Sequence, residues 1–296
     1  MRVLVTGGAG FIGSHLVDAL VERGDKVTVV DDLSTGRRGF VNEAARLLEH
    51  DVRGPFETDA DIVFHLAAQA DVGTSVERPA FDAEVNVVGT VNVLEAARGA
   101  GAAVVFSSTG GAIYGDVASP ASEDAPLRPV SPYGIAKLSG EAYVDGWRRI
   151  HGLRAVALRF ANVYGPRQSA SLEGGVIAIF LERMAAGEET VVFGDGEQSR
   201  DFVHVADVVR ALLLAADRNG GVYNVGTGVE TSVNRLHELC RSVVGDAAEA
   251  RHAEARAGDA RRSVLDVSRA AAELGWQPEI ELEEGLRATW EAIQQE

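Results

Sequence analysis

The sequence is poor in cysteine, in basic residues and in long apolar runs, and each shortage excludes a class of protein. Its only cysteine is Cys240, so the chain cannot form an internal disulfide, and a reducing cytoplasm is the expected location. Acidic residues outnumber basic residues by 44 to 28, and the formal net charge of −16 argues against nucleic acid or an anionic membrane surface as a partner. No apolar run approaches the length of a membrane span, and Met1–Val5 enters a predicted strand at once, unlike a signal peptide.

What remains is the composition of an ordinary globular protein. The 296 residues suffice for one large domain or two smaller ones, with 46% hydrophobic and 24% charged residues. The sequence shows no internal repeat and no low-complexity tract, and we predict no metal site. Because the chain is acidic overall, any anionic ligand must be held by a local group of basic residues.

The N-terminal segment has the order strand, glycine turn, helix, strand and acidic residue. Val3–Val5 is typical of a buried parallel strand, and the segment Gly7–Gly13 carries glycine at its first, fourth and seventh positions. Such glycines let the backbone approach a pyrophosphate at a helix N-terminus, although glycines also form tight turns without a ligand. The strand Val27–Val30 leads to Asp31, which is placed to hydrogen-bond an adenosine ribose and would repel a 2′-phosphate. The segment therefore predicts dinucleotide binding, with NAD favoured over NADP.

Strands and helices continue to alternate beyond this unit. The apolar runs Ile62–Leu66 and Ala103–Phe106 predict strands, and Phe81–Arg98 and Ser131–Ile150 predict long helices. Short connections between alternating strands and helices predict an α/β fold with a doubly wound parallel sheet, of the Rossmann type. In such sheets ligands bind at the carboxyl ends of the strands.

Several polar residues inside these elements favour a structural role over a chemical one. His65 could act as a base, but a histidine that ends an apolar strand is more often packed and hydrogen-bonded, and we adopt that interpretation. Asn86 lies inside a predicted helix and is expected to brace the backbone. We expect Asp201 and Asp207 to cap or brace as well.

Two segments carry the predicted chemistry. Tyr133 and Lys137 are four residues apart and share one face of a helix. An ammonium beside a phenol favours the phenolate, so the tyrosine could act as a base below its solution pKa of about 10. One lysine seldom supplies the whole shift, so a second positive charge, such as an oxidised nicotinamide ring, is expected nearby. A hydroxyl from Ser108 or Thr109, directly after the Ala103–Phe106 strand, could hydrogen-bond the same substrate oxygen.

Tyr-x-x-x-Lys also occurs in many helices as an ordinary exposed pair, and the dinucleotide motif is what favours the catalytic interpretation. In combination, the motifs resemble the extended short-chain dehydrogenase/reductase family, and within it the nucleotide-sugar 4-epimerases of the UDP-glucose 4-epimerase kind. The resemblance covers nearly the whole chain. It rests on Thr6–Gly13, Asp31–Gly36, His65–Ala68, Ser107–Thr109, Tyr133–Lys137, Arg159–Gln168, Arg200–Asp207 and Arg256–Asp259.

The resemblance implies a bound NAD cofactor, with Asp51 and Val52 near the adenine and Lys137 on the nicotinamide ribose. The residues that it places against NAD are Gly7, Gly10, Phe11, Ile12, Gly13, Asp31, Asp32, Leu33, Ser34, Thr35, Gly36, Asp51, Val52, Leu66, Ala67, Ala68, Ser107, Tyr133, Lys137 and Phe160. It implies that Tyr133 is the catalytic base and that a hydroxyl assists it. We favour Thr109 for this hydroxyl over Ser108, although the segment that follows is one residue longer than the usual family pattern.

In the second half of the chain the resemblance implies a UDP-sugar site. The residues that it places there are Asn162, Val176, Val191, Phe193, Arg200, Arg256 and Asp259. Arg200 and Arg256 would grip the diphosphate, because the planar guanidinium pairs with two phosphate oxygens at once. They would also supply the local positive charge that the acidic chain needs. Asn162 could instead be a capping residue in a turn.

The implied reaction is NAD-dependent 4-epimerisation of UDP-glucose or UDP-galactose through a transient 4-keto sugar. The small Ser263 would leave room for an N-acetyl group, so UDP-N-acetylhexosamines are candidate substrates too. Dehydration is disfavoured, because Gly110 and Gly111 stand where the dehydratases carry Asp and Glu. A glucuronate 4-epimerase or decarboxylase remains an alternative through Arg167, although Ser169 replaces the arginine of the glucuronate epimerases. A non-catalytic NAD-binding relative is less favoured, because the catalytic residue types are all present.

Two expectations concern architecture. We expect an NAD-binding domain over residues 1–165, with a segment around 203–216 packing back on it, and a smaller α/β substrate domain over 166–296. By analogy with relatives, the helices Phe81–Arg98 and Ser131–Ile150 would pair in the four-helix bundle of a homodimer.

Overall fold

The structure is a computed structural model that describes residues 1–115, 120–170, 175–245, 248–255 and 261–295. Two residues predicted to contact the substrate, Arg256 and Asp259, lie outside these ranges. None of the described helices combines the length and the apolar character needed to cross a membrane.

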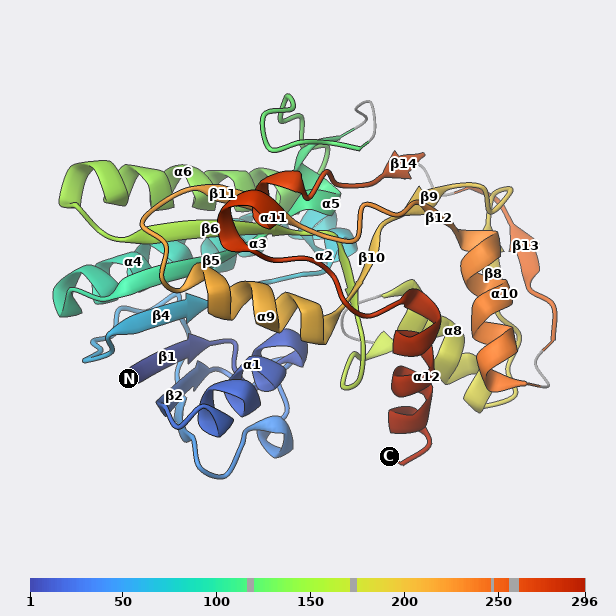
Figure 1. Cartoon of the computed structure of the whole chain (residues 1–296), viewed down its shortest axis with the longest axis horizontal. Helices are drawn as coiled ribbons and strands as arrows, with labels where there is room; N and C mark the ends of the chain where they lie inside the picture. Colours follow the sequence, from blue (N-terminus) through green and yellow to red (C-terminus); the bar gives the residue numbers. More distant parts are fainter. Residues whose placement is uncertain (116–119, 171–174, 246–247, 256–260, 296) are drawn as a thin grey trace.

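A seven-stranded sheet forms the centre of the larger part of the molecule (Figure 1). Its strands are β1 (Arg2–Thr6), β2 (Lys26–Asp31), β3 (Arg46–Glu49), β4 (Ile62–His65), β5 (Ala103–Thr109), β6 (Ala155–Phe160) and β11 (Val222–Val225). The spatial order is β11-β6-β5-β4-β1-β2-β3, and every neighbouring pair is parallel. The chain reverses its direction of travel across the sheet between β1 and β4, which opens a crevice at their carboxyl ends. The predicted doubly wound parallel sheet is confirmed.

Helices cover both faces of this sheet, because successive strand side chains point to opposite sides. The covering helices are α1 (Phe11–Glu22), α4 (Gly89–Ala100), α6 (Pro132–His151), α9 (Val205–Ala215) and α11 (Ser268–Leu274). Val3 and Val5 of β1 pack in one core with α1, α9 and α11, whereas Leu4 packs in the other core with α4 and α6. Figure 1 shows α4 and α6 on one side of the sheet and α1 and α9 on the other.

The predicted helix over Phe81–Arg98 is a series of segments and not one regular helix. It consists of α3 (Pro79–Ala83), a π-helical turn (Glu84–Val88) and α4, and it follows the short helix α2 (Val72–Glu77). The buried Asn86 lies in the π turn, where its side chain accepts from the backbone N–H of Gln69 and donates to the carbonyl oxygen of the same residue. The structural interpretation of Asn86 is therefore confirmed. A π turn widens the helix by one residue, and such turns are frequent at functional sites.

The smaller part of the molecule lies beside the carboxyl end of the sheet (Figure 1). Its helices are α8 (Val176–Ala185), α10 (Val233–Val244) and α12 (Leu282–Ile293), which share a core that contains Cys240. Short strand pairs and one triplet complete it: β7 (Asn162–Tyr164) with β10 (Phe202–His204), β8 (Val191–Phe193) with β13 (Arg251–Ala253), and β12 (Thr231–Ser232) with β9 (Ser199–Arg200) and β14 (Arg262–Ser263). Within the described ranges, the remaining short elements are a 3-10 turn (Arg38–Phe40) and α5 (Gly110–Ile113).

The segment that returns to the larger part is longer than the sequence predicted. Helix α9 packs on α1 as expected, but β11 also joins the edge of the sheet beside β6, and α11 packs in the same core. The expected segment around 203–216 therefore ends too early, because the apolar strand β11 follows it and completes the sheet. Asp201 and Asp207 brace this region, as predicted: Asp201 accepts from the backbone of Thr227 and Gly228, and Asp207 from that of Glu279 and Ile280.

His65 is a packed and hydrogen-bonded residue of the core. Its Nδ1 lies 2.8 Å from the hydroxyl of Thr6 and its Nε2 lies 3.0 Å from the hydroxyl of Thr90. Because the Thr90 hydroxyl donates to the carbonyl oxygen of Asn86, it must accept from Nε2–H, which fixes the neutral tautomer. Complete burial lowers the pKa of His65 to about 3, and the charge of Lys137 adds to this effect. The structural interpretation of His65 is confirmed.

This depressed pKa predicts that acid destabilises the fold. Between the folded pKa of about 3 and the unfolded value of about 6.5, the unfolded chain binds more protons, so stability is lost as pH falls. Between about pH 7.5 and pH 5, His65 alone should lower the free energy of unfolding by roughly 2 kcal/mol. In urea unfolding at these two pH values, His65→Gln should lose less stability than the wild type by about that amount. Equal losses in the two proteins would contradict the assignment.

Candidate active site

A cleft of about 850 Å³ lies at the carboxyl ends of β1, β2, β4 and β5. It is lined by residues of the glycine turn Gly7–Gly13, by the strand ends Leu66–Ala68 and Ser107–Ser108, and by Tyr133 and Lys137 of α6. All the residues predicted to contact the cofactor line this cleft except Leu33, whose backbone N–H donates to Asp31. Residues that are far apart in the sequence are therefore gathered along one cavity.

The glycine turn is shaped by contacts that leave no room for side chains. Gly7 has a φ of +72°, and a Cβ there would lie 2.6 Å from the backbone nitrogen of Ala67. A Cβ on Gly13 would lie 2.1 Å from the carbonyl oxygen of Gly7. Helix α1 starts at Phe11 without a side-chain cap, so its first amide groups face the cleft end of the helix. This cradle suits a pyrophosphate.

Asp31 connects this turn to the end of β2. The residue is 8% exposed, and its two carboxylate oxygens accept backbone N–H groups from Ala9 and Leu33 at 2.9 Å each. Burial raises the pKa of Asp31, and these two hydrogen bonds oppose the shift. Each oxygen retains capacity for another donor, such as a ribose hydroxyl. The neighbouring Asp32 adds a second carboxylate, which makes this end of the cleft unfavourable for a 2′-phosphate.

The start of α6 fixes the position of Tyr133. Ser131 caps the helix by accepting from the backbone N–H of Gly134, and Pro132 occupies the first turn. One turn later, the buried Lys137 donates from Nζ to the carbonyl oxygen of Ser107 at 2.9 Å. This bond ties α6 to the end of β5 and holds the tyrosine over the strand.

The protein alone does not lower the pKa of Tyr133. The side chain is only half-buried, but its hydroxyl sits in a desolvated position, and desolvation raises the pKa to about 12. The hydrogen bond with Thr109 lowers it, and the charge of Asp82 raises it further. Desolvation also lowers the pKa of Lys137 to about 8, against the opposing charges of Asp82 and Glu141. The second positive charge predicted from the sequence is therefore still required for a phenolate.

The two candidate hydroxyls point to different partners. Thr109 hydrogen-bonds Tyr133, whereas Ser108 donates to Glu141 at 2.5 Å. Glu141 in turn forms a buried ion pair with Arg159, with an N–O distance of 2.7 Å. This geometry favours Thr109 as the hydroxyl that assists Tyr133 and makes Ser108 part of a buried network.

The residues predicted to contact the substrate fall into two groups. Asn162 lies beside the catalytic end of the cleft, since its side-chain oxygen and the Thr109 hydroxyl both lie within 4 Å of the Cβ position of Gly111. Val176, Val191, Phe193 and Arg200 lie on α8, β8 and β9 of the smaller part and do not line the described cleft. Arg200 pairs in register with Ser263 of the neighbouring strand, so these two predicted residues are adjacent.

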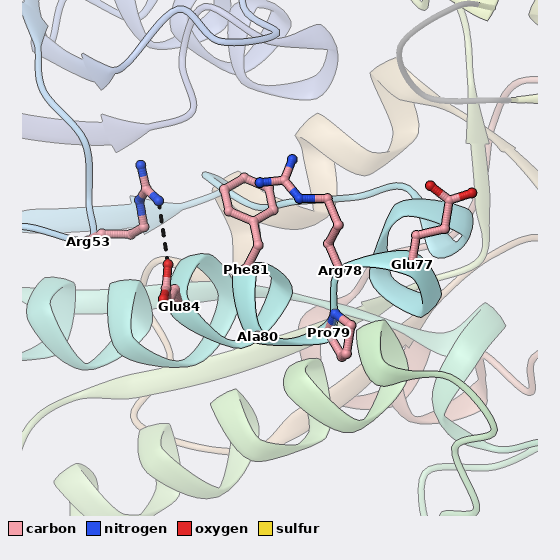
Figure 2. Close-up of a pocket in the computed structure, with 7 residues that line it drawn as sticks. All are labelled: Arg53, Glu77, Arg78, Pro79, Ala80, Phe81 and Glu84. Carbon is pink, nitrogen blue, oxygen red and sulfur yellow. Dashed lines mark ion pairs between the residues drawn. The ribbon is translucent and has the colours of Figure 1, made fainter.

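The structure also adds cleft residues that the sequence did not indicate. Gln69, Arg53, Arg78 and Phe81 line the cavity near Asp51. Figure 2 shows the Arg78 guanidinium over the ring of Phe81, 4.3 Å from its centroid, and Arg53 beside them in an ion pair with Glu84. No motif marks these residues, because only the approach of the segment after β3 to α3 brings them together.

Arg167 is held away from the cleft. Its guanidinium forms an ion pair with Asp18 of α1 at 2.8 Å and lies over the ring of Phe40. The same loop is tied to α1 through His15, whose Nε2 lies 2.9 Å from the carbonyl oxygen of Pro166. The sequence offered Arg167 as a cation for a substrate carboxylate. In the structure, its guanidinium instead joins its loop to α1.

Residues 3–226 match the NAD dependent epimerase/dehydratase family. The chain belongs to this family. Among relatives within it, the UDP-glucose 4-epimerase of Mycolicibacterium smegmatis is 47% identical over 98% of both chains. The crystal structure of the Thermotoga maritima UDP-glucose 4-epimerase with UDP-glucose superposes with a TM-score of 0.95 at 47% identity, over 100% of this chain and 99% of that one. The Thermus thermophilus UDP-glucose 4-epimerase complex with NAD superposes with a TM-score of 0.93 at 42% identity, over 99% of both chains.

The cleft fits the cofactor of this NAD-dependent family. The tight glycine turn would admit the pyrophosphate, Asp31 would accept from the adenosine ribose, and the small residues Ala67 and Ala68 would let the cofactor lie against the end of β4. Lys137, which lines the same cleft, would hold the other ribose.

The glycine turn predicts the effect of one added methyl group. In Gly13→Ala, the Cβ would meet backbone atoms of Gly7, so the turn must shift. We expect the free energy of unfolding to fall by about 1–3 kcal/mol and NAD affinity, measured by calorimetry, to fall at least tenfold. Gly99→Ala on α4 is the control, because nothing lies within 4 Å of its Cβ position, and it should bind NAD normally. Normal NAD binding by Gly13→Ala would contradict this account of the turn.

Proposed function

We propose that the protein is an NAD-dependent nucleotide-sugar 4-epimerase that interconverts UDP-glucose and UDP-galactose through a transient 4-keto sugar. The observation that carries the proposal is that Tyr133 and Lys137 line the same cleft as the glycine turn, with Thr109 near enough to Tyr133 to lower its pKa by hydrogen bonding. The names of the relatives support the same activity.

Tyr133, Thr109 and Lys137 each have a separate role in the proton transfer. Bound NAD would supply the hydride acceptor, and in reduced form the hydride donor, for the sugar C4. Tyr133 takes the proton of the C4 hydroxyl. It gives the proton back to the C4 oxygen after the keto sugar has rotated to present its other face. Thr109 holds that oxygen by a hydrogen bond, and the Lys137 ammonium favours the ionised tyrosine.

The sugar must turn without leaving, so the nucleotide must be held more firmly than the sugar. Asn162, Arg200 and Arg256 would bind the diphosphate, and Asp259 would face the nucleotide ribose. Val176, Val191 and Phe193 would frame the uracil end of the site. The small Ser263 beside Arg200 would leave space for an N-acetyl group, which extends the proposed substrates to UDP-N-acetylhexosamines.

Alternative reactions of the family receive less support. A dehydratase needs acidic side chains where this chain has Gly110 and Gly111, and a Cβ on Gly110 would lie 2.5 Å from the side chain of Leu265. A glucuronate 4-epimerase or decarboxylase would need a cation for the C6 carboxylate, and Arg167 is already paired with Asp18. A non-catalytic role would not explain the hydrogen bonding between Tyr133 and Thr109.

The test is incubation of the purified protein, without added NAD, with UDP-glucose, UDP-N-acetylglucosamine and UDP-glucuronate separately, followed by proton NMR. We expect the C4 epimer of UDP-glucose to appear, because a cofactor that is regenerated in each cycle should remain bound. Tyr133→Phe should lose turnover and still bind NAD. If no epimer forms even with NAD added, the proposal fails.

The separate partners of Thr109 and Ser108 predict separate effects. Thr109→Ala should lower kcat about 100-fold with little change in stability, because it removes a hydrogen bond at the reacting oxygen. Ser108→Ala should leave kcat within a few-fold and lower the free energy of unfolding by about 1–3 kcal/mol, because Glu141 loses a buried donor. Steady-state kinetics and urea unfolding of both variants would show the reverse pattern if Ser108 were the catalytic hydroxyl.

We also propose a cytoplasmic homodimer that pairs through α4 and α6. Support comes from large apolar side chains exposed on α6 and on the π turn before α4: Val88 is 48% exposed, Ile135 54% and Ile150 72%. Light scattering should give a mass of about twice 31.3 kDa, and Ile150→Glu should shift it towards the monomer. A monomeric wild type would refute the dimer.

A further inference from the structure

A buried carboxylate that the reaction does not use lies on α3, the helix that packs against Tyr133 and Lys137's helix α6. Asp82 is 1% exposed and sits on α3, which packs against α6. Its Oδ1 accepts from the side-chain amides of Gln69 and Asn86, at 2.9 Å each. Its Oδ2 has no hydrogen-bond partner in the described part of the chain. A buried polar atom without a partner is costly, so this one calls for an explanation.

The charge of Asp82 is not neutralised by its neighbours. Both hydrogen-bond partners are neutral amides, and no ion pair of Asp82 is found among the described residues. Glu141, the other buried carboxylate beside Lys137, differs in this respect, because the guanidinium of Arg159 binds both of its oxygens. The field of Asp82 therefore acts on whatever titratable groups face it.

Those groups lie on the long helix that packs against α3. On α6 they are Tyr133 and Lys137, and the carboxylate of Asp82 raises the pKa of both. Desolvation raises the pKa of Asp82, and the hydrogen bonds from Gln69 and Asn86 and the charge of Lys137 oppose that shift. His65 of β4 also feels the charge of Lys137, but complete burial keeps this imidazole neutral. Gln69 and Asn86, which hold the carboxylate in place, do not titrate.

We propose that Asp82 is a positioning residue that sets the protonation of the Tyr133–Lys137 pair, which rests on the proposed 4-epimerase function. Its carboxylate stabilises the ammonium of Lys137 and opposes the phenolate of Tyr133, so that Tyr133 holds its proton until another positive charge enters the cleft. Desolvation alone would favour a neutral Lys137, and a neutral amine gives no support to a phenolate. Asp82 thus keeps the lysine charged without taking part in the proton transfer itself.

Asp82→Asn removes the negative charge and keeps the hydrogen bonds that the side chain accepts. The asparagine oxygen can still accept from Gln69 and Asn86, and its amide group would replace Oδ2, the atom that has no partner among the described residues. Glu95→Gln is the matched control, since it also removes one carboxylate but from a half-exposed position on α4, paired with Arg98.

The first measurement is the pH profile of kcat/KM for wild type, Asp82→Asn and Glu95→Gln. In Asp82→Asn, the acid limb (Tyr133) and the alkaline limb (Lys137) should both move to lower pH by about half a unit or more, a threefold change in proton affinity. Glu95→Gln should leave both limbs in place. A purely structural role would lower the activity of Asp82→Asn without moving either limb, and that result overturns the proposal.

The second measurement does not need turnover. Ultraviolet absorbance titration of the cofactor-free protein, with Tyr133→Phe as the reference for subtraction, follows the ionisation of Tyr133 alone. The wild type should titrate near pH 12 and Asp82→Asn at lower pH. If Asp82→Asn does not fold, Asp82→Ser is the second neutral variant. If neither folds, a Tyr133 pKa of 10 or lower in the wild type overturns the proposal. Because this titration stands without any substrate, a failed epimerase assay and a failed role for Asp82 give different results.

Discussion

The hydrogen bond from Lys137 to the carbonyl oxygen of Ser107 is the contact on which the rest of the site depends. It joins a helix on one face of the sheet to the carboxyl end of β5, and it satisfies an ammonium that burial would otherwise neutralise. One helical turn earlier, the same constraint holds Tyr133 over Thr109. Because Thr109 ends β5 and Ala67 and Ala68 follow β4, the parallel register of these strands places the end of β5 beside the residues of β4 that line the cleft.

Burial shifts the pKa values of the residues in this site more than close ion pairs do. Near Lys137, the acidic chain carries buried negative charge in two forms: Glu141 is matched by Arg159, and Asp82 is held by neutral amides. The Glu141–Arg159 pair supports the end of β5 rigidly. The charge of Asp82, which no ion pair offsets among the described residues, acts on the titratable groups of α6. An unaided Tyr133 remains a neutral phenol in this environment. Tyr133 therefore ionises only when a ligand brings a positive charge into the cleft. When the cleft is empty, the tyrosine keeps its proton.

Much of this arrangement could be predicted from the sequence, because the relevant signals are local. The glycine turn, the alternation of strands and helices, and the spacing of Tyr133 and Lys137 each depend on neighbours within a few turns of chain. The placement of Arg78 over Phe81, the pairing of Arg167 with Asp18 and the addition of β11 to the sheet could not be predicted in this way. They depend on contacts between distant segments, for which single positions carry no signal. The rise in the pKa of Tyr133 was missed for a related reason, since desolvation depends on the whole packed surroundings and not on one adjacent lysine.

The π turn at Glu84–Val88 has a consequence for how this helix could have arisen and how it could change. Such a turn is equivalent to the insertion of one residue into a regular helix. Removing that residue would restore the regular hydrogen bonding and rotate everything before it by about 100° relative to α4. Asp82 would then turn away from α6 while the core-facing side of α4 stayed in place. Length variation at this single position could therefore remove or restore the buried charge among homologous chains while the sheet remains intact.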